Sequence, residues 1–168
     1  IRYLFGGDLL RQGIATSMGV EALQIPMFGL YGACSTSGEA LALASMSAAA
    51  GYGGTMIAVT SSHFGSAEKE FRFPLGYANQ RPLSSHWTVT GSGAFLVQSA
   101  EEYRKQNTKS YFSNIRITGV TVGKIVDYGL KDSQNMGACM APAAMDTIVQ
   151  NFQDMERKEK DYDRIITG

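Results

Sequence analysis

The residue best placed for chemistry is a cysteine in a tight turn just before a long alanine-rich stretch. Cys34 lies in the tetrapeptide Gly32-Ala33-Cys34-Ser35, and the strong helix formers that follow end at Gly51, which predicts a helix over about residues 35–50. The unpaired N–H groups and the positive dipole end of a helix favour an anion and lower the pKa of a thiol. Cys34 is therefore a nucleophilic thiolate or part of an anion-binding turn, unless it is the small buried apolar residue that most free cysteines are.

Three further residues could serve the same pocket. His63 directly follows a second buried strand, predicted over residues 55–60, and is either a candidate base or an ordinary hydrogen-bonding histidine. Ser35 offers a hydrogen-bond donor at the start of the helix. Arg81 lies in an irregular, charged and aromatic stretch over residues 64–87, where its guanidinium could clamp a carboxylate or remain solvated.

Asp8 has two interpretations. It is a good N-cap for a helix that begins near Leu9, because apolar residues recur on one helical face of the following segment. It could instead present its carboxylate to a ligand, since Gly6 and Gly7 precede it. The residues by themselves favour the cap.

The candidate residues depend on a strand, helix and strand that position them. Residues 25–31 are predicted to form a strand that leads into the turn and makes a parallel, right-handed unit with the helix and the strand over residues 55–60. Ligands gather at the carboxyl ends of such strands, so Cys34 and residues 60–63 should face one pocket. We therefore predict an α/β fold with a mixed, mainly parallel sheet around a buried helix, layered α-β-α.

The rest of the chain gives weaker patterns. We expect a strand over residues 88–99, a polar turn over 101–109, a strand over 115–126 and the start of a strand over 162–167. Pro142 is expected near the start of a helix that carries one apolar stripe. The irregular stretch over residues 64–87 is long enough to cover the pocket or to form a dimer contact.

Composition narrows the classes of function. The 168 residues carry 15 basic and 15 acidic side chains, so the formal net charge of zero gives no reason to expect a nucleic-acid partner. No apolar run reaches the length of a membrane span. The only cysteines, Cys34 and Cys139, lack metal-ligand spacing, so neither a zinc site nor a disulfide framework is predicted. Ile1 and Gly168 both have the character of interior positions, so we expect a single domain, residues 1–168, that is incomplete at both ends.

Several sequence blocks resemble one protein family. The turn with Cys34 and the motif Gly91-Ser92-Gly93-Ala94 resemble the N-terminal half of the thiolase and ketoacyl-synthase superfamily. More specifically, the chain resembles the stage V sporulation protein AD family over essentially all of its length. The blocks that carry this resemblance are residues 28–36, 59–64, 71–77 and 80–94.

The resemblance implies a thiolase-like half fold whose pocket binds dipicolinic acid, pyridine-2,6-dicarboxylate, during its uptake into the developing spore and its release at germination. Cys34 matches the superfamily's nucleophile position but would line the pocket without catalysis. We expect Asp8, His63, Ser35 and Arg81 as further ligand-binding residues. No cofactor or bound metal is expected, although calcium can accompany the ligand. The alternative is an acyltransferase of the thiolase or ketoacyl-synthase type that uses Cys34 as its nucleophile.

The resemblance also implies partners and a location. It predicts a peripheral protein at the inner membrane of the spore or forespore, with the other stage V sporulation A proteins as membrane partners, and a homodimer. Superfamily enzymes take further catalytic residues from a C-terminal half that this chain does not contain, so we do not expect an enzyme. Without that half, a large apolar face should be exposed.

Overall fold

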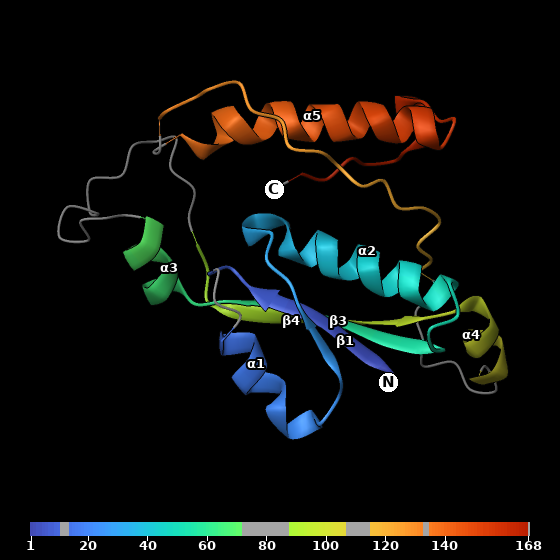
Figure 1. Ribbon diagram of the computed structural model, residues 1–168. Helices are drawn as coiled ribbons and strands as arrows, with labels where there is room; N and C mark the ends of the chain where they lie inside the picture. Colours follow the sequence, from blue (N-terminus) through green and yellow to red (C-terminus); the bar gives the residue numbers. More distant parts are fainter. Residues whose placement is uncertain (11–13, 72–87, 107–114, 133–134, 168) are drawn as a thin grey trace. The chain divides into compact units, whose positions relative to one another are not determined.

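A computed structural model describes residues 1–10, 14–71, 88–106, 115–132 and 135–167 (Figure 1). The chain divides into two compact units. Unit 1 comprises residues 1–77 and 88–117, and unit 2 comprises residues 78–87 and 118–168.

Unit 1 is built on a four-stranded sheet with the order β2-β1-β3-β4. Its strands are β1 (Tyr3–Asp8), β2 (Met27–Gly29), β3 (Thr55–Ser62) and β4 (Gly91–Gln98). β1 pairs in parallel with both β2 and β3, whereas β4 runs antiparallel to β3. The prediction of a mixed, mainly parallel sheet is confirmed.

Helices cover both faces of this sheet (Figure 1). α2 (Thr36–Ala49) lies over one face, and α1 (Ile14–Val20), which a 3-10 turn over Glu21–Leu23 continues, lies over the other. Side chains alternate along β1, so Phe5 joins the core under α2, while a Cβ on Gly6 would meet Thr16 of α1. The predicted α-β-α layering is therefore confirmed.

Small residues make the contact between α2 and the sheet. Ala40, Ala44 and Ala48 recur every four residues along one buried stripe. The other side of α2 is open, and Met46 is 49% exposed, so the helix is buried on one face and not on every side. The core cluster on this face consists of Phe5, Ala40, Ala44, Ala48, Met56 and Ala58.

Two glycines bring the end of β1 against its neighbours. A Cβ on Gly6 would come within 2.7 Å of the carbonyl oxygen of Val59 on β3, and a Cβ on Gly7 would overlap the carbonyl oxygen of Leu30. The N–H of Leu30 donates to the carbonyl of Gly6 at 2.8 Å. The chain that leaves β2 is thus held directly against the backbone of β1, and the turn with Cys34 begins there.

The N-terminal segment differs from its prediction. Asp8 is the last residue of β1, so it is not the N-cap of a helix beginning near Leu9, and α1 begins only at Ile14. The strand β1 was not predicted, because two adjacent glycines, Gly6 and Gly7, normally weaken a strand. β2 is shorter than the predicted residues 25–31, and its neighbour is β1 and not β3.

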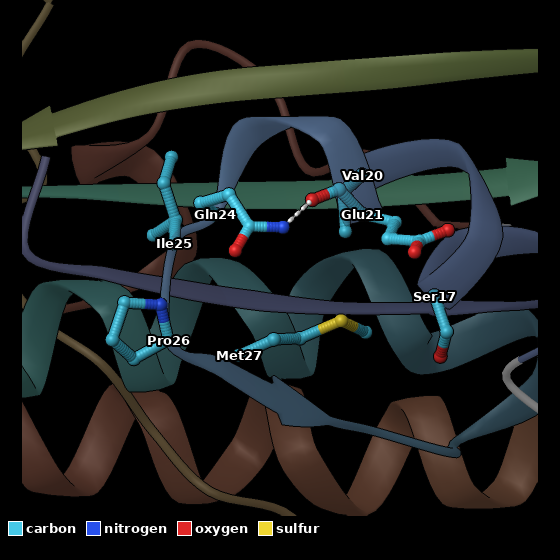
Figure 2. A pocket seen from close by; sticks show the side chains of 7 residues that line it. All are labelled: Ser17, Val20, Glu21, Gln24, Ile25, Pro26 and Met27. Carbon is cyan, nitrogen blue, oxygen red and sulfur yellow. Dashed lines mark hydrogen bonds between the residues drawn. The ribbon is translucent and has the colours of Figure 1, made fainter.

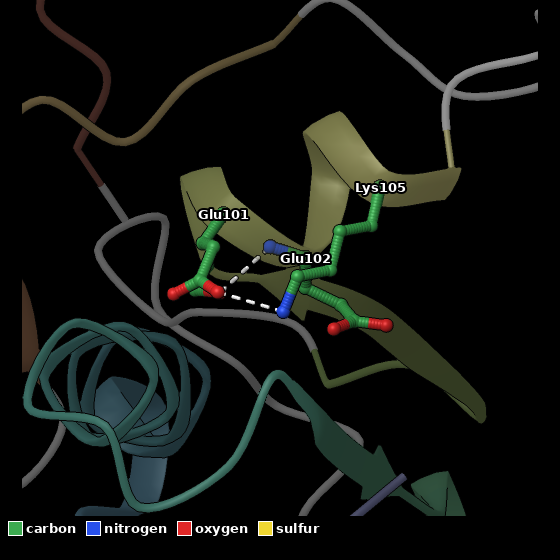
Figure 3. Close-up of polar contacts among 4 residues, drawn as sticks. Glu101, Glu102 and Lys105 are labelled. Carbon is green, nitrogen blue, oxygen red and sulfur yellow. Dashed lines mark hydrogen bonds and ion pairs between the residues drawn. The ribbon is translucent and has the colours of Figure 1, made fainter.

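Two short helices flank β3 and β4. α3 (Phe64–Phe71) follows β3, and α4 (Ala100–Gln106) follows β4 where a polar turn was predicted. On α4, Lys105 Nζ lies 2.7 Å from Glu101 Oε1 (Figure 3). The hydrogen bond and charge of Lys105 lower the pKa of Glu101, and the same pair raises the pKa of Lys105. Both side chains are exposed, so this pair contributes little to stability.

Unit 2 centres on α5 (Met136–Asp154). The side-chain oxygen of Asn135 caps this helix by accepting a hydrogen bond from the N–H of Ala138 at 3.2 Å. Pro142 was expected near the start of this helix but lies inside it, so the helix begins earlier than expected. Within the described ranges, no helix has both the length and the apolar character that a bilayer crossing requires.

Extended segments accompany α5 without forming strands. Asn151 on α5 donates a hydrogen bond to Thr121 Oγ1 at 2.9 Å and accepts one from the hydroxyl of Tyr162 at 2.6 Å. Residues 115–126 and 162–167 were both predicted as strands, but neither belongs to a sheet among the residues that the structure describes. Both segments have β-type sequences, yet a strand requires a neighbour for its backbone groups.

Gly7→Ala tests the close approach between β1 and the turn after β2. The added methyl group must displace the carbonyl of Leu30, so we expect the free energy of unfolding to fall by about 2–3 kcal/mol in chemical denaturation. Gly29→Ala is the matched control, because a Cβ on this strand glycine has no heavy atom within 4 Å. Equal losses in the two variants would show that the approach at Gly7 is not tight.

Candidate functional site

The turn before α2 presents Cys34 on a strained backbone. Residues Ala33–Ser35 form a single 3-10 turn. Ala33 has a φ of 47°, in the left-handed region that costs a residue with a side chain about 1–2 kcal/mol. Such strain persists only where the surrounding contacts hold it in place. Cys34 itself is a free, exposed thiol, so its interpretation as a buried apolar residue is wrong.

Two hydroxyl groups hold this turn together. Thr36 Oγ1 accepts a hydrogen bond from the N–H of Gly32 at 3.0 Å and donates one to the carbonyl of Ala33 at 2.8 Å. The hydroxyl of Ser35 donates to the carbonyl of Gly32 at 2.7 Å. The proton of Ser35 is therefore already used within the turn, and only its oxygen lone pairs remain for a ligand.

The start of α2 combines an uncapped helix end with a nearby carboxylate. Ser35 is the N-cap residue and makes no side-chain cap hydrogen bond, but the N–H groups of Ser35 and Thr36 already donate to the carbonyls of Gly32 and Ala33, so the positive end of the helix dipole is the main attraction here. This arrangement favours an anion. Glu39 also lies in the first turn, and its Oε2 would be 3.0 Å from a Cβ on Gly32. Its charge opposes an anion there, so an anionic ligand needs further positive groups.

Asp8 ends at the same edge of the sheet but on the opposite face from α2. Side chains two residues apart on a strand point to the same face, so the side chain of Asp8 points to the same face as a Cβ on Gly6 would. That Cβ would lie near Thr16 of α1, whereas a Cβ on Gly7 would lie near Thr36 of α2. Asp8 is only 6% exposed, and Ser61 of β3 is its partner in the strand register. The structure thus brings the backbone of β1 to the turn with Cys34 but directs the carboxylate of Asp8 away from it.

His63 follows β3 as predicted, but β1 separates its strand from the strand that leads to Cys34. The exposed ring turns toward α3, because the N–H and the hydroxyl of Ser66 both lie 3.4 Å from Nδ1. The carbonyl of His63 accepts a hydrogen bond from the N–H of Ala67 at 3.0 Å. The described hydrogen bonds of His63 therefore serve the first turn of α3.

Asp8, Cys34, Ser35 and His63 line neither of two pockets that the described residues form. Arg81 lies outside the described residues. Unit 1 has a pocket of about 390 Å³ beside α1 and β2 (Figure 2). Unit 2 has one of about 290 Å³ along α5. The first is lined by Ser17, Val20, Glu21, Gln24, Ile25, Pro26 and Met27, and the second by Thr121, Thr147, Ile148, Asn151, Phe152, Tyr162, Arg164 and Ile165.

Sequence reasoning missed Thr16 on α1 and the proximity of Glu39 to the turn with Cys34, whereas Ser61 belongs to the predicted segment 60–63. Thr16 is 3% exposed, and its Oγ1 lies 3.5 Å from Oγ of Ser61. Glu39 lies in the first turn of α2, near Gly32. Their roles depend on which strands are neighbours, which no local pattern reveals. No cluster of three or more His, Cys, Asp or Glu side chains that could hold a metal occurs in the part of the chain that the structure describes.

Ala33→Gly tests whether the turn is strained. Glycine adopts a positive φ freely, so relief of the strain should exceed the entropic cost of glycine, and we expect the free energy of unfolding to rise by about 0.5–1 kcal/mol. Ala42→Gly in the middle of α2 is the control and should lower it by about 1 kcal/mol. Chemical denaturation measures both changes, and a loss of stability in Ala33→Gly would contradict the strained turn.

Comparison with known proteins agrees with the sequence resemblance. The profile of the family "Stage V sporulation protein AD (SpoVAD)" matches residues 1–168. The protein named Stage V sporulation protein AD from Bacillus subtilis (strain 168) is 42% identical over 168 residues, which is 100% of this chain and 46% of that protein. The chain thus spans about half the length of the curated relative it matches. It belongs to the Stage V sporulation protein AD family, a family of sporulation proteins.

Proposed function

We propose that the chain contributes to a non-catalytic binding site for dipicolinic acid, which the protein takes up into the developing spore and releases at germination. The observation that carries this proposal is the strained turn that presents Cys34 at the uncapped start of α2. A carboxylate at this position would interact favourably with the positive end of the helix dipole.

The charges around the turn define what such a site still requires. Dipicolinate carries two carboxylates, and Glu39 places a further negative charge beside the turn. Positive groups must therefore approach from elsewhere, and Arg81 is our candidate because its guanidinium can bind a carboxylate through two parallel donors. Arg81 thus remains in the proposed binding set with Cys34 and Ser35.

The alternative is an acyltransferase with Cys34 as its nucleophile. A cysteine nucleophile normally has a base within hydrogen-bond reach. The described hydrogen bonds of His63 instead serve α3, and β1 separates the strands that precede the two residues. These observations argue against His63 as the base for Cys34.

Calorimetric titration of the full-length protein with dipicolinate tests this function. We expect saturable binding that Cys34→Ala weakens by about 10-fold, since one well-placed contact is worth about 1.4 kcal/mol. Cys139→Ala is the matched control, because Cys139 is also a free, exposed thiol but lies on α5. Mass spectrometry after incubation with an acyl thioester should detect no adduct on Cys34. An adduct there without dipicolinate binding would establish the acyltransferase instead.

We also propose that the protein acts as a homodimer, peripheral to the inner spore membrane, where the other stage V sporulation A proteins are its partners. An edge strand supports the dimer: β4 lies at the end of the sheet, and six of its eight residues are exposed. The sequence of β4, Gly-Ser-Gly-Ala-Phe-Leu-Val-Gln, contains no charge and no proline. Most edge strands carry such residues to prevent pairing, and an uncharged strand can pair with its own copy without placing like charges opposite each other.

Leu96→Lys tests the pairing of β4. A lysine on this strand, where Leu96 is 49% exposed, should convert the dimer to a monomer because it introduces like charges at the contact. Leu130→Lys is the control, since Leu130 is 53% exposed but lies outside β4. Sedimentation equilibrium gives the mass of each form. A monomeric unsubstituted protein, or dissociation by both variants alike, would contradict the proposal.

A further inference from the structure

A buried polar cluster lies under α1, at the carboxyl edge of the sheet. Asp8 and Thr16 are 6% and 3% exposed. Asp8 is opposite Ser61 in the register of β1 and β3, and the hydroxyl oxygens of Thr16 and Ser61 are 3.5 Å apart. A Cβ on Gly6, two residues before Asp8 on the same face of β1, would lie 3.2 Å from the methyl group of Thr16. Three oxygen-bearing side chains, from β1, β3 and α1, therefore lie on one side of the sheet.

One of these oxygens lacks a partner. Oδ2 of Asp8 is buried and makes no hydrogen bond, the single case among side-chain atoms of the described residues. A buried carboxylate oxygen without a hydrogen bond or an opposite charge is strongly unfavourable. The two described ion pairs, Lys105 with Glu101 and Lys124 with Asp146, do not involve Asp8. A positive group beside Asp8 would stabilise its ionised form.

We propose that Asp8, Thr16 and Ser61 bind a hard cation of the size of calcium. The 3.5 Å between the two hydroxyl oxygens is at the outer limit of a hydrogen bond. It matches two adjacent ligands of Ca²⁺, because metal–oxygen distances of 2.3–2.6 Å at a right angle place the oxygens about 3.3–3.7 Å apart. For Mg²⁺, with metal–oxygen distances of 2.0–2.1 Å, the same geometry gives about 2.8–3.0 Å.

The composition of the site sets its affinity. It has one carboxylate and two neutral hydroxyls, and calcium sites with few charged ligands have dissociation constants of about 10⁻⁴–10⁻³ M. The remaining coordination positions go to backbone carbonyls or water, as is usual for Ca²⁺. The site lies on the face of the sheet that α1 covers, opposite α2 and the turn with Cys34, so it does not depend on dipicolinate binding.

Thermal unfolding with added CaCl₂ tests this site. The chelator-treated full-length protein is titrated at constant ionic strength, with MgCl₂ in parallel. A tenfold excess of Ca²⁺ over its dissociation constant should raise the melting temperature by about 1–3 °C, and Mg²⁺ should raise it less. Asp8→Asn should remove the calcium response and, without metal, be at least as stable as the unsubstituted protein, because it removes an unpaired buried charge.

Two further variants control this experiment. Ser61→Ala removes one neutral ligand and should weaken the calcium response without abolishing folding, which keeps the test valid if Asp8→Asn does not fold. Asp163→Asn removes an exposed carboxylate and should leave the response unchanged. The proposal is overturned if calcium does not stabilise the unsubstituted protein, or if Mg²⁺ stabilises it as well as Ca²⁺ does. It is also overturned if Asp8→Asn or Ser61→Ala shows the same calcium response as the unsubstituted protein.

Discussion

The contact between backbones at Gly6 and Gly7 is the constraint on which unit 1 depends. Because neither residue has a side chain, β1 lies against Val59 on one side and against the chain near Leu30 on the other. The same two positions face opposite sides of the sheet, so one glycine admits α1 and the other admits Thr36 at the start of α2. The close backbone contacts that these two glycines allow thus position both helical layers and the turn before α2.

The turn of the candidate site is fixed in two ways. The chain that leads into it is hydrogen-bonded to the backbone of β1, and the hydroxyl groups of the turn form hydrogen bonds within it. The hydroxyls of Ser35 and Thr36 form hydrogen bonds with the backbone of the turn, and the positive end of the helix dipole lies beside an exposed thiol. Glu39 limits how much negative charge this position tolerates. A small anion can bind here only when other parts of the protein supply positive charge, which suits a site shared between several segments.

The sequence allowed the central elements to be predicted where local signals agree. α2 and β3 were placed within two residues of their observed bounds, because strong helix formers end at Gly51 and a β-branched run follows. β1 was missed because adjacent glycines are unfavourable in a strand unless close backbone contact requires them. Residues 115–126 alternate like a strand, yet pairing depends on a neighbour that the local sequence does not specify.

The candidate site was predictable in its position but not in its geometry. The turn and helix identified Cys34 and Ser35, which lie next to each other in the structure. The separation of His63 from Cys34 depends on β1 lying between β2 and β3, and the direction of Asp8 depends on the face that Gly6 occupies. Both are consequences of long-range pairing. Spacing along the chain indicated which edge of the sheet these residues share but not which face.

The alanine stripe of α2 has a mechanical consequence. Ala40, Ala44 and Ala48 have no side-chain rotamers with which to absorb a change in the core, so pressure from the sheet passes directly to the helix backbone. A helix of 14 residues is a rod about 21 Å long, and its first turn adjoins Cys34. An enlarged side chain beneath Ala48 would therefore displace the backbone of α2. Because the helix moves as one rod, Cys34 at its other end would move as well, without contacting the enlarged side chain.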